Sequence, residues 1–133
     1  MKRVFVDANI LFSAAYREDA GLLRLWHIRE VELTTSDYAA QEAAMNLSEP
    51  DQRRRLDELL KRINVERRPA ILPCLPAGTV LPEKDKPILQ AAMAAGAGFL
   101  LTGDVAHFGR YFGKTIGGVR ILLPSDFLRE TGM

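Results

Sequence analysis

Short apolar runs and longer helical stripes follow one another along this chain. The short runs predict strands, because a strand buried in a sheet appears in the sequence as a brief, nearly continuous hydrophobic segment. The expected strands cover residues 2–6, 31–35, 70–74, 99–101 and 119–122. Between them, apolar residues recur every three or four positions, which predicts helices. The expected helical segments are 10–12, 22–26, 37–47, 51–63, 88–95, 105–111 and a last helix from residue 125.

The order of these elements indicates the fold class. Strands that alternate with helices predict a parallel sheet covered on both faces and joined by right-handed crossovers. We therefore expect an α/β fold, a three-layer α/β/α sandwich with a parallel sheet of about five strands. The length of 133 residues is that of one domain, so we expect a single domain over 1–133. The strand at 70–74 lies between Pro69 and Pro76, and these prolines limit it to a short segment.

Composition and charge exclude several classes of protein. Hydrophobic residues make up 47% of the chain and charged residues 26%, which is typical of a folded globular protein. The longest apolar runs are too short to cross a bilayer, and Asp7 interrupts the segment that a signal peptide would need. We expect a cytoplasmic protein with no membrane partner. The single cysteine, Cys74, excludes an internal disulfide, and we expect it to be a small buried side chain.

Positive charge is concentrated in one stretch, although the net charge is only +1. Seven basic residues fall between residues 53 and 68, including Arg53, Arg54 and Arg55. Opposite charges four positions apart indicate a solvated helix face with ion pairs. The expected pairs are Asp57 with Lys61, Arg54 with Glu58, and Glu58 with Arg62. The other interpretation is that Arg53 to Arg55 contact phosphates.

Two acidic residues follow apolar strands directly. Asp7 comes after the first strand, and Asp104 comes after the strand 99–101. One such residue by itself is best explained as a helix cap. In open parallel sheets, however, ligands bind beyond the carboxyl ends of the strands, where the strand order reverses. If these two strands are neighbours at that point, both carboxylates enter one crevice.

Carboxylates that share a crevice repel one another unless a cation neutralises them. Oxygen ligands without a His or Cys pair favour Mg²⁺ or Mn²⁺, and His27 and His107 do not resemble a zinc pair. Asn9 and Thr102 stand beside Asp7 and Asp104, so we assign them supporting roles in orienting a carboxylate or a water.

The segments Arg3–Leu11 and Leu100–Asp104, with His107–Phe108 after them, resemble the PIN-domain family. The likeness is strongest to its VapC-like toxins, the ribonucleases of bacterial toxin–antitoxin modules, and it spans nearly the whole chain. Gly98 departs from the pattern, because relatives often have an acidic residue there. The resemblance implies a site of four acidic residues. They are Asp7 after the first strand, Glu42 on the helix after the second, Asp85 at the start of the helix before the fourth, and Asp104 after the fourth.

Two other acidic residues compete for the places of Glu42 and Asp85. Asp37 lies on the same helix as Glu42, but it is better explained as a cap. Glu83 lies two residues from Asp85, and its position before the helix makes it the poorer fit.

The resemblance implies an Mg²⁺- or Mn²⁺-dependent endoribonuclease that hydrolyses phosphodiester bonds of single-stranded RNA with one or two ions. Asp7 and Asp104 would be the principal ligands, Asp85 a ligand or water-positioning group, and Glu42 a ligand or general base. Arg110 and Lys114 are candidates for phosphate contacts. The implied partners are a small antitoxin and a second copy of the chain. The alternatives are a nuclease of the same fold that acts in RNA processing, or a catalytically silent RNA-binding domain.

Overall fold

The strands of the chain form one sheet. The computed structural model describes residues 1–69 and 71–132, and its six strands lie in the order β3-β2-β1-β4-β6-β5. All neighbouring strands are parallel except β5, which is antiparallel to β6. The strands are β1 (Lys2–Val6), β2 (Val31–Ser36), β3 (Asn64–Glu66), β4 (Phe99–Leu101), β5 (Thr115–Ile116) and β6 (Val119–Leu122).

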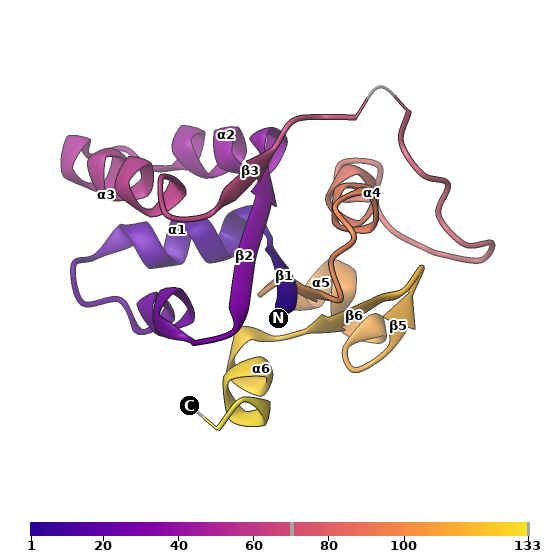
Figure 1. Cartoon of the computed structure of the whole chain (residues 1–133). Coiled ribbons are helices and arrows are strands. Elements are labelled where there is room, and N and C mark those ends of the chain that lie inside the picture. Colours follow the sequence, from indigo (N-terminus) through magenta and orange to yellow (C-terminus); the bar gives the residue numbers. More distant parts are fainter. Residues whose placement is uncertain (70, 133) are drawn as a thin grey trace.

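Helices cover both faces of this sheet. In Figure 1, α1 (Ala8–Tyr16), α2 (Asp37–Asn46) and α3 (Pro50–Leu60) lie on one side, and α4 (Lys86–Ala94) and α5 (Val105–Phe108) lie on the other. The remaining helical segments are the 3₁₀ helices η1 (Gly21–His27) and η2 (Gly109–Tyr111) and the last helix, α6 (Pro124–Glu130). The expected α/β/α sandwich is therefore confirmed. None of the helices in the described residues is long and apolar enough to span a membrane.

The core lies around the two central strands. Val4, Phe5 and Val6 of β1 and Leu100 and Leu101 of β4 have no exposed surface. Side chains of a strand alternate between the two faces, so this continuous burial requires helices on both sides. The apolar runs in the sequence are thus explained by the position of these strands in the middle of the sheet.

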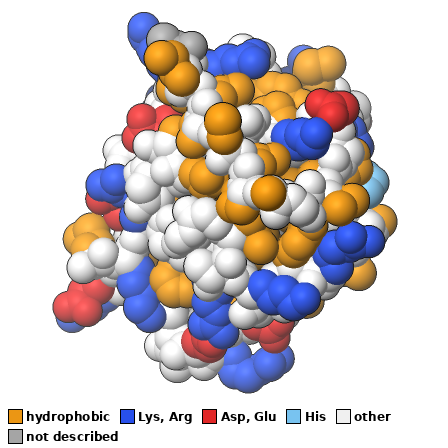
Figure 2. Space-filling model, turned by 90° about the vertical axis from the view of Figure 1, so that its right-hand side faces the viewer, with side chains coloured by type: hydrophobic (Ala, Val, Ile, Leu, Met, Phe, Trp, Pro, Cys, Tyr) orange, Lys and Arg blue, Asp and Glu red, His pale blue; other side chains and the backbone are white. Residues whose placement is uncertain are grey.

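The segment between β3 and α4 differs from its prediction. Ala70 lies outside the described residues, and residues 71–74 do not form the expected strand. Pro69 and Pro73 have no backbone N–H to donate to a neighbouring strand. The segment lies on the surface, where Ile71 is 86% exposed and the expectation that Cys74 is buried is wrong. Figure 2 shows hydrophobic side chains on the face of the molecule along which this segment runs in Figure 1.

The expected ion pairs on α3 are also wrong in their spacing. The pairs that form there are Arg54 with Asp51 and Lys61 with Glu58, each three residues apart. All four side chains are well exposed, which is the solvated helix face that the charge pattern indicated. Exposed pairs of this kind contribute only about 0.2–1 kcal/mol each.

Two arginines of the same helix bind backbone carbonyls of other helices, although Arg53 is exposed and Arg55 half-buried. The Nε of Arg53 donates to the carbonyl of Leu47 at 2.8 Å, where α2 ends. Arg55 donates to the carbonyls of Ala15 and Tyr16, both at 2.9 Å, at the end of α1. These carbonyls have no partner within their own helices, and a cation there also complements the helix dipole. Arg53 and Arg55 therefore join α3 to the ends of α2 and α1.

Candidate active site

The order of the strands brings Asp7 and Asp104 close together, at the carboxyl ends of two neighbouring strands. β1 and β4 are parallel neighbours, with Val6 opposite Leu101, and the Asp7 N–H continues the pairing to the Leu101 carbonyl at 3.0 Å. From these two strands the order runs outward in opposite directions, to β2 and β3 on one side and to β6 and β5 on the other. This reversal is the switch point, so the condition under which the sequence places both carboxylates in one crevice is met.

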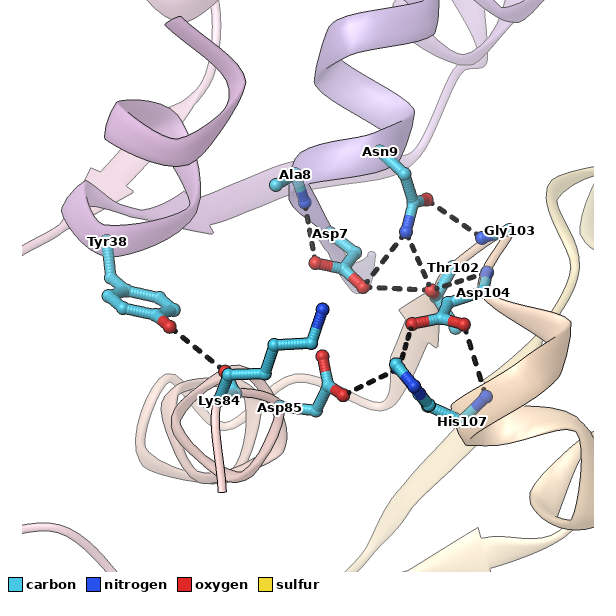
Figure 3. A network of polar contacts seen from close by, with 10 residues as sticks. All are labelled: Asp7, Ala8, Asn9, Tyr38, Lys84, Asp85, Thr102, Gly103, Asp104 and His107. Carbon is cyan, nitrogen blue, oxygen red and sulfur yellow. Dashed lines mark hydrogen bonds and ion pairs between the residues drawn. The ribbon is translucent and has the colours of Figure 1, made fainter. Parts of the chain in front are cut away.

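Asp7 is buried and accepts three hydrogen bonds (Figure 3). Its Oδ1 accepts from the backbone N–H of Ala8 at 2.6 Å, so it does cap α1 as a single strand-end Asp would. Its Oδ2 accepts from the hydroxyl of Thr102 at 2.8 Å and from the amide of Asn9 at 3.2 Å. Capping and a place in the crevice are therefore not alternatives for this residue.

Asn9 and Thr102 connect the ends of the two strands. The side-chain oxygen of Asn9 accepts from the N–H of Gly103 at 2.8 Å. The Thr102 hydroxyl accepts from the N–H of Asp104 at 3.1 Å while it donates to Asp7. These contacts orient the Asp7 carboxylate and fix the backbone at Gly103 and Asp104, and Thr102 at their centre has no exposed surface.

The environment of Asp7 disfavours its negative charge. Burial raises the pKa of Asp7 from 3.8 to about 6. The hydrogen bonds from Thr102 and Ala8 oppose this shift, and the charges of Glu42 and Asp85 add to it. A cation in the crevice would reverse these effects, because it would stabilise the charged carboxylate.

Asp85, Asp104 and His107 form a second polar group in the same region (Figure 3). Asp104 caps α5, with its Oδ1 accepting from the His107 N–H at 3.1 Å. The Nδ1 of the His107 ring lies 2.8 Å from Asp104 Oδ2 and 2.9 Å from Asp85 Oδ2. One ring nitrogen thus faces two carboxylate oxygens from different elements.

Asp85 has an unsatisfied acceptor. The residue is 8% exposed, and its Oδ2 is buried with no hydrogen bond. Although His107 Nδ1 is close, this nitrogen carries at most one hydrogen, and the hydrogen bond to Asp104 uses it. Burial raises the pKa of Asp85, an effect that His107 opposes and Asp104 increases. Buried acceptors are normally paired, so the orphaned oxygen fits a site for a cation.

All four expected acidic residues line one cleft of about 730 Å³. Glu42 reaches it from α2 and Asp85 from the start of α4, whereas Asp7 and Asp104 reach it from the carboxyl ends of β1 and β4. The competing residues lie elsewhere. Asp37 accepts from the Tyr38 N–H outside this cleft, and Glu83 pairs with Lys86 with its side chain 88% exposed.

Two residues of this region were missed at the sequence level. His107 was named in the family motif and rejected as half of a zinc pair, but it was given no role in the site, because one histidine in a short helix carries no spacing signal. Lys84 precedes Asp85 and lines the cleft, and Figure 3 shows its amine directed toward the carboxylates. Its backbone carbonyl accepts from the Tyr38 hydroxyl at 3.0 Å, which connects α2 to the segment before α4.

The expected phosphate contacts are not brought to the cleft. Arg110 lies in η2 and Lys114 follows it, and neither lines the cleft. Arg53 and Arg55 are occupied by helix-end carbonyls. Among the described residues, Lys84 is the one lysine or arginine that lines the cleft.

Comparison with known proteins shows the fold. The chain matches neither a protein-family profile nor a curated protein sequence. Among solved structures, it is similar to a chain of VapBC2 from Rickettsia felis bound to a DNA fragment from their promoter. The TM-score is 0.64 at 16% identity, covering 90% of this chain and 96% of that one. A chain of FitAB bound to an IR36 DNA fragment gives 0.60 at 14% identity, covering 91% and 94%. The chain therefore has the PIN-like α/β fold that its strand-end motifs implied.

Proposed function

We propose that this chain is a metal-dependent ribonuclease that hydrolyses phosphodiester bonds of single-stranded RNA. The observation that carries the proposal is the convergence of Asp7, Glu42, Asp85 and Asp104 on one cleft. These residues come from distant parts of the sequence, and their mutual repulsion disfavours the metal-free arrangement. Stability alone gives no reason for such a cluster, whereas binding of a divalent cation does.

The residues present fit Mg²⁺ or Mn²⁺, which bind carboxylate oxygens. Asp85 and Asp104 would hold the ion, because Asp85 Oδ2 lacks a hydrogen bond and Asp104 lies beside it. Asp7 would complete the site from the end of the neighbouring strand β1. Such an ion, when bound, supplies activation of a water and neutralisation of charge on the scissile phosphate.

The other polar groups in the cleft have complementary roles. Lys84 is a candidate for the phosphate contact, in place of Arg110 and Lys114, because its amine is directed into the acidic cleft. Glu42 is half-buried on α2, where we propose that it accepts a proton from the attacking water. Asn9 and Thr102 hold Asp7 and the segment around Asp104 in place.

Cleavage of single-stranded RNA by purified protein tests the proposal. We expect cleavage with Mg²⁺ or Mn²⁺, no cleavage with EDTA, and loss of a factor on the order of 10³ in Asp7→Asn and Asp85→Asn. Loss of an ion's several kcal/mol of stabilisation is of this size, since about 1.4 kcal/mol corresponds to a factor of ten. Glu83→Gln and Asp37→Asn are matched controls, because these acids lie near the site residues in sequence but outside the cleft. Full activity in Asp7→Asn would contradict the proposal.

We further propose that the chain is the toxin of a toxin–antitoxin pair. The support is the resemblance of its strand-end motifs to VapC-like toxins, together with the similarity of its fold to chains of VapBC2 and FitAB. The partner would be a small antitoxin that covers the acidic cleft. Induction of the wild-type chain should arrest growth, and induction of Asp7→Asn should not. Equal growth of both strains, with cleavage intact in vitro, would favour a nuclease of RNA processing instead.

A second copy of the chain is the other partner that we propose, by the same resemblance. Sedimentation of the purified protein should show a dimer. A monomer at all concentrations tested would count against it.

A further inference from the structure

The ring of His107 is placed where a metal ligand would lie. Its Nδ1 is 2.8 Å from Asp104 Oδ2 and 2.9 Å from Asp85 Oδ2. One donor atom from each of Asp85, Asp104 and His107 lies within 4.8 Å of the other two. Adjacent ligands of an octahedral ion with bonds of about 2.1 Å are about 3.0 Å apart, the length of an octahedron edge. The two nitrogen–oxygen distances are close to that value.

A hydrogen-bonding role by itself leaves this arrangement unexplained. Nδ1 offers a single hydrogen, which Asp104 accepts, so the buried Asp85 Oδ2 remains without a partner. A cation bound by the nitrogen and by both carboxylates would satisfy all three groups together.

The backbone holds this ring in place. His107 lies in α5, and Asp104 Oδ1 caps that helix by accepting from the His107 N–H. The next residue, Phe108, has no exposed surface and anchors the short helix in the core. The His107 side chain itself is 33% exposed, so it can be reached by an ion from solvent.

We propose that His107 is a nitrogen ligand of the metal site, so that the site has a mixed imidazole and carboxylate donor set. This inference rests on the metal dependence proposed above. Imidazole binds Mn²⁺ more readily than it binds Mg²⁺, whose ligands in proteins are mainly oxygen atoms. The consequence is a site that prefers Mn²⁺ to Mg²⁺ more strongly than four carboxylates would.

Pulsed electron paramagnetic resonance of Mn²⁺ bound to the protein tests this assignment directly, without measuring activity. An imidazole ligand couples its ¹⁴N nucleus to the electron spin of the metal. We expect this nitrogen coupling in the wild-type protein and its loss in His107→Gln. The chain has two histidines, so His27→Gln is the matched control, and His27 is exposed on η1. This control should keep the coupling.

Histidine labelled with ¹⁵N provides a version of the experiment that needs no substitution. The label should change the nitrogen coupling of the wild-type protein, and this result is independent of whether His107→Gln folds. Metal titration adds a second measurement. The Kd for Mn²⁺ should rise on the order of 10- to 100-fold in His107→Gln, and the Kd for Mg²⁺ by a smaller factor.

The outcomes separate this inference from the proposed function. Bound Mn²⁺ without nitrogen coupling in the wild-type protein would overturn the role of His107 and leave the carboxylate site intact. Coupling that survives in His107→Gln would overturn it as well. Absence of any Mn²⁺ binding would overturn both the inference and the metal-dependent function.

Discussion

At the scale of a single residue, burial of the Asp7 carboxylate reduces stability, although the proposed metal site needs this carboxylate. It is 4% exposed, and in the metal-free protein its pKa is raised to about 6. The network around it partly offsets the cost of burial, through hydrogen bonds from Thr102 and Ala8. With this pKa, Asp7 carries its charge at pH 8 even in the metal-free protein, and a bound cation would offset the cost of burying that charge.

The stability of the metal-free protein should therefore depend on the protonation of Asp7. Its pKa is about 6 in the folded state and 3.8 as the reference for the unfolded chain. The stabilisation by the bound proton is complete below pH 3.8 and is lost as the pH rises through about 6. This change lowers the free energy of unfolding by at most about 3 kcal/mol. The side chain of Asp7→Asn is neutral at every pH and avoids the cost of burying a negative charge. This variant should therefore be more stable than the wild type at pH 8 and similar to it at pH 4.

Urea denaturation of both proteins in EDTA at these two pH values measures the difference. A variant that is less stable than the wild type at pH 8, or a difference that does not change with pH, would contradict the role of burial at Asp7.

Thr102 should control the pKa of Asp7. In Thr102→Val, Asp7 Oδ2 loses a donor and the Asp104 N–H loses its acceptor. We expect the pKa of Asp7 to rise further and the free energy of unfolding to fall by about 1–3 kcal/mol. NMR titration of the Asp7 carboxyl carbon measures the first effect. Thr34→Val is the control, because the buried Thr34 hydroxyl donates to the Asn64 carbonyl instead. It should reduce stability without moving the pKa of Asp7.

At the scale of elements, the helices on one face are connected through side chains as well as by packing. α3 contributes Arg53 and Arg55, which bind the carbonyls at the ends of α2 and α1. α2 is connected to the segment before α4 through Tyr38 and the Lys84 carbonyl. The second of these contacts connects the two elements that bring Glu42 and Asp85 to one cleft.

Arg55 and Arg54 provide a matched test of this arrangement. Arg55→Ala removes two hydrogen bonds from a charged group to the end of α1, so we expect a loss of about 1.5–3 kcal/mol. Arg54→Ala removes only an exposed ion pair and should cost at most about 1 kcal/mol. Chemical denaturation measures the free energy of unfolding of both variants. Equal effects would show that Arg55 acts only as a surface charge.

At the scale of the whole molecule, the cleft joins elements that are far apart in the sequence. A metal ion bound there would be coordinated by residues that follow β1, open α4 and follow β4. Such an ion binds the folded state and not the unfolded chain, so binding must stabilise the whole fold.

Mn²⁺ at about 100 times its Kd should stabilise the protein by about 2.7 kcal/mol. This corresponds to a rise in Tm of several degrees in a thermal scan, which EDTA should reverse. The double variant Asp85→Asn with Asp104→Asn should show no such rise. An equal rise in that variant would place the bound ion somewhere other than the cleft.

Elements with a strong hydrophobic pattern could be predicted from the sequence. β1, β4 and β6 are apolar because they lie in the interior of the sheet, and the helices follow from their spacing and caps. β3 and β5 were missed for the opposite reason. β3 is exposed at the sheet edge, and β5 has two residues, so neither has an apolar pattern to detect. The apolar residues at 71–74 resembled a strand, but they lie on the surface.

The sequence by itself determined that Asp7 and Asp104 each follow a strand directly, and chain direction in a parallel sheet places the carboxyl ends of its strands on one side. That β1 and β4 are neighbours, so that both carboxylates enter one crevice, is a result of the tertiary structure. Only the tertiary structure decided which other side chains join them. Glu42 and Asp85 lie on separate helices, and Lys84 and His107 have no spacing signal. Contacts between residues distant in the chain depend on how helices pack against the sheet. Local patterns determine the elements, and packing determines which side chains can share one ion.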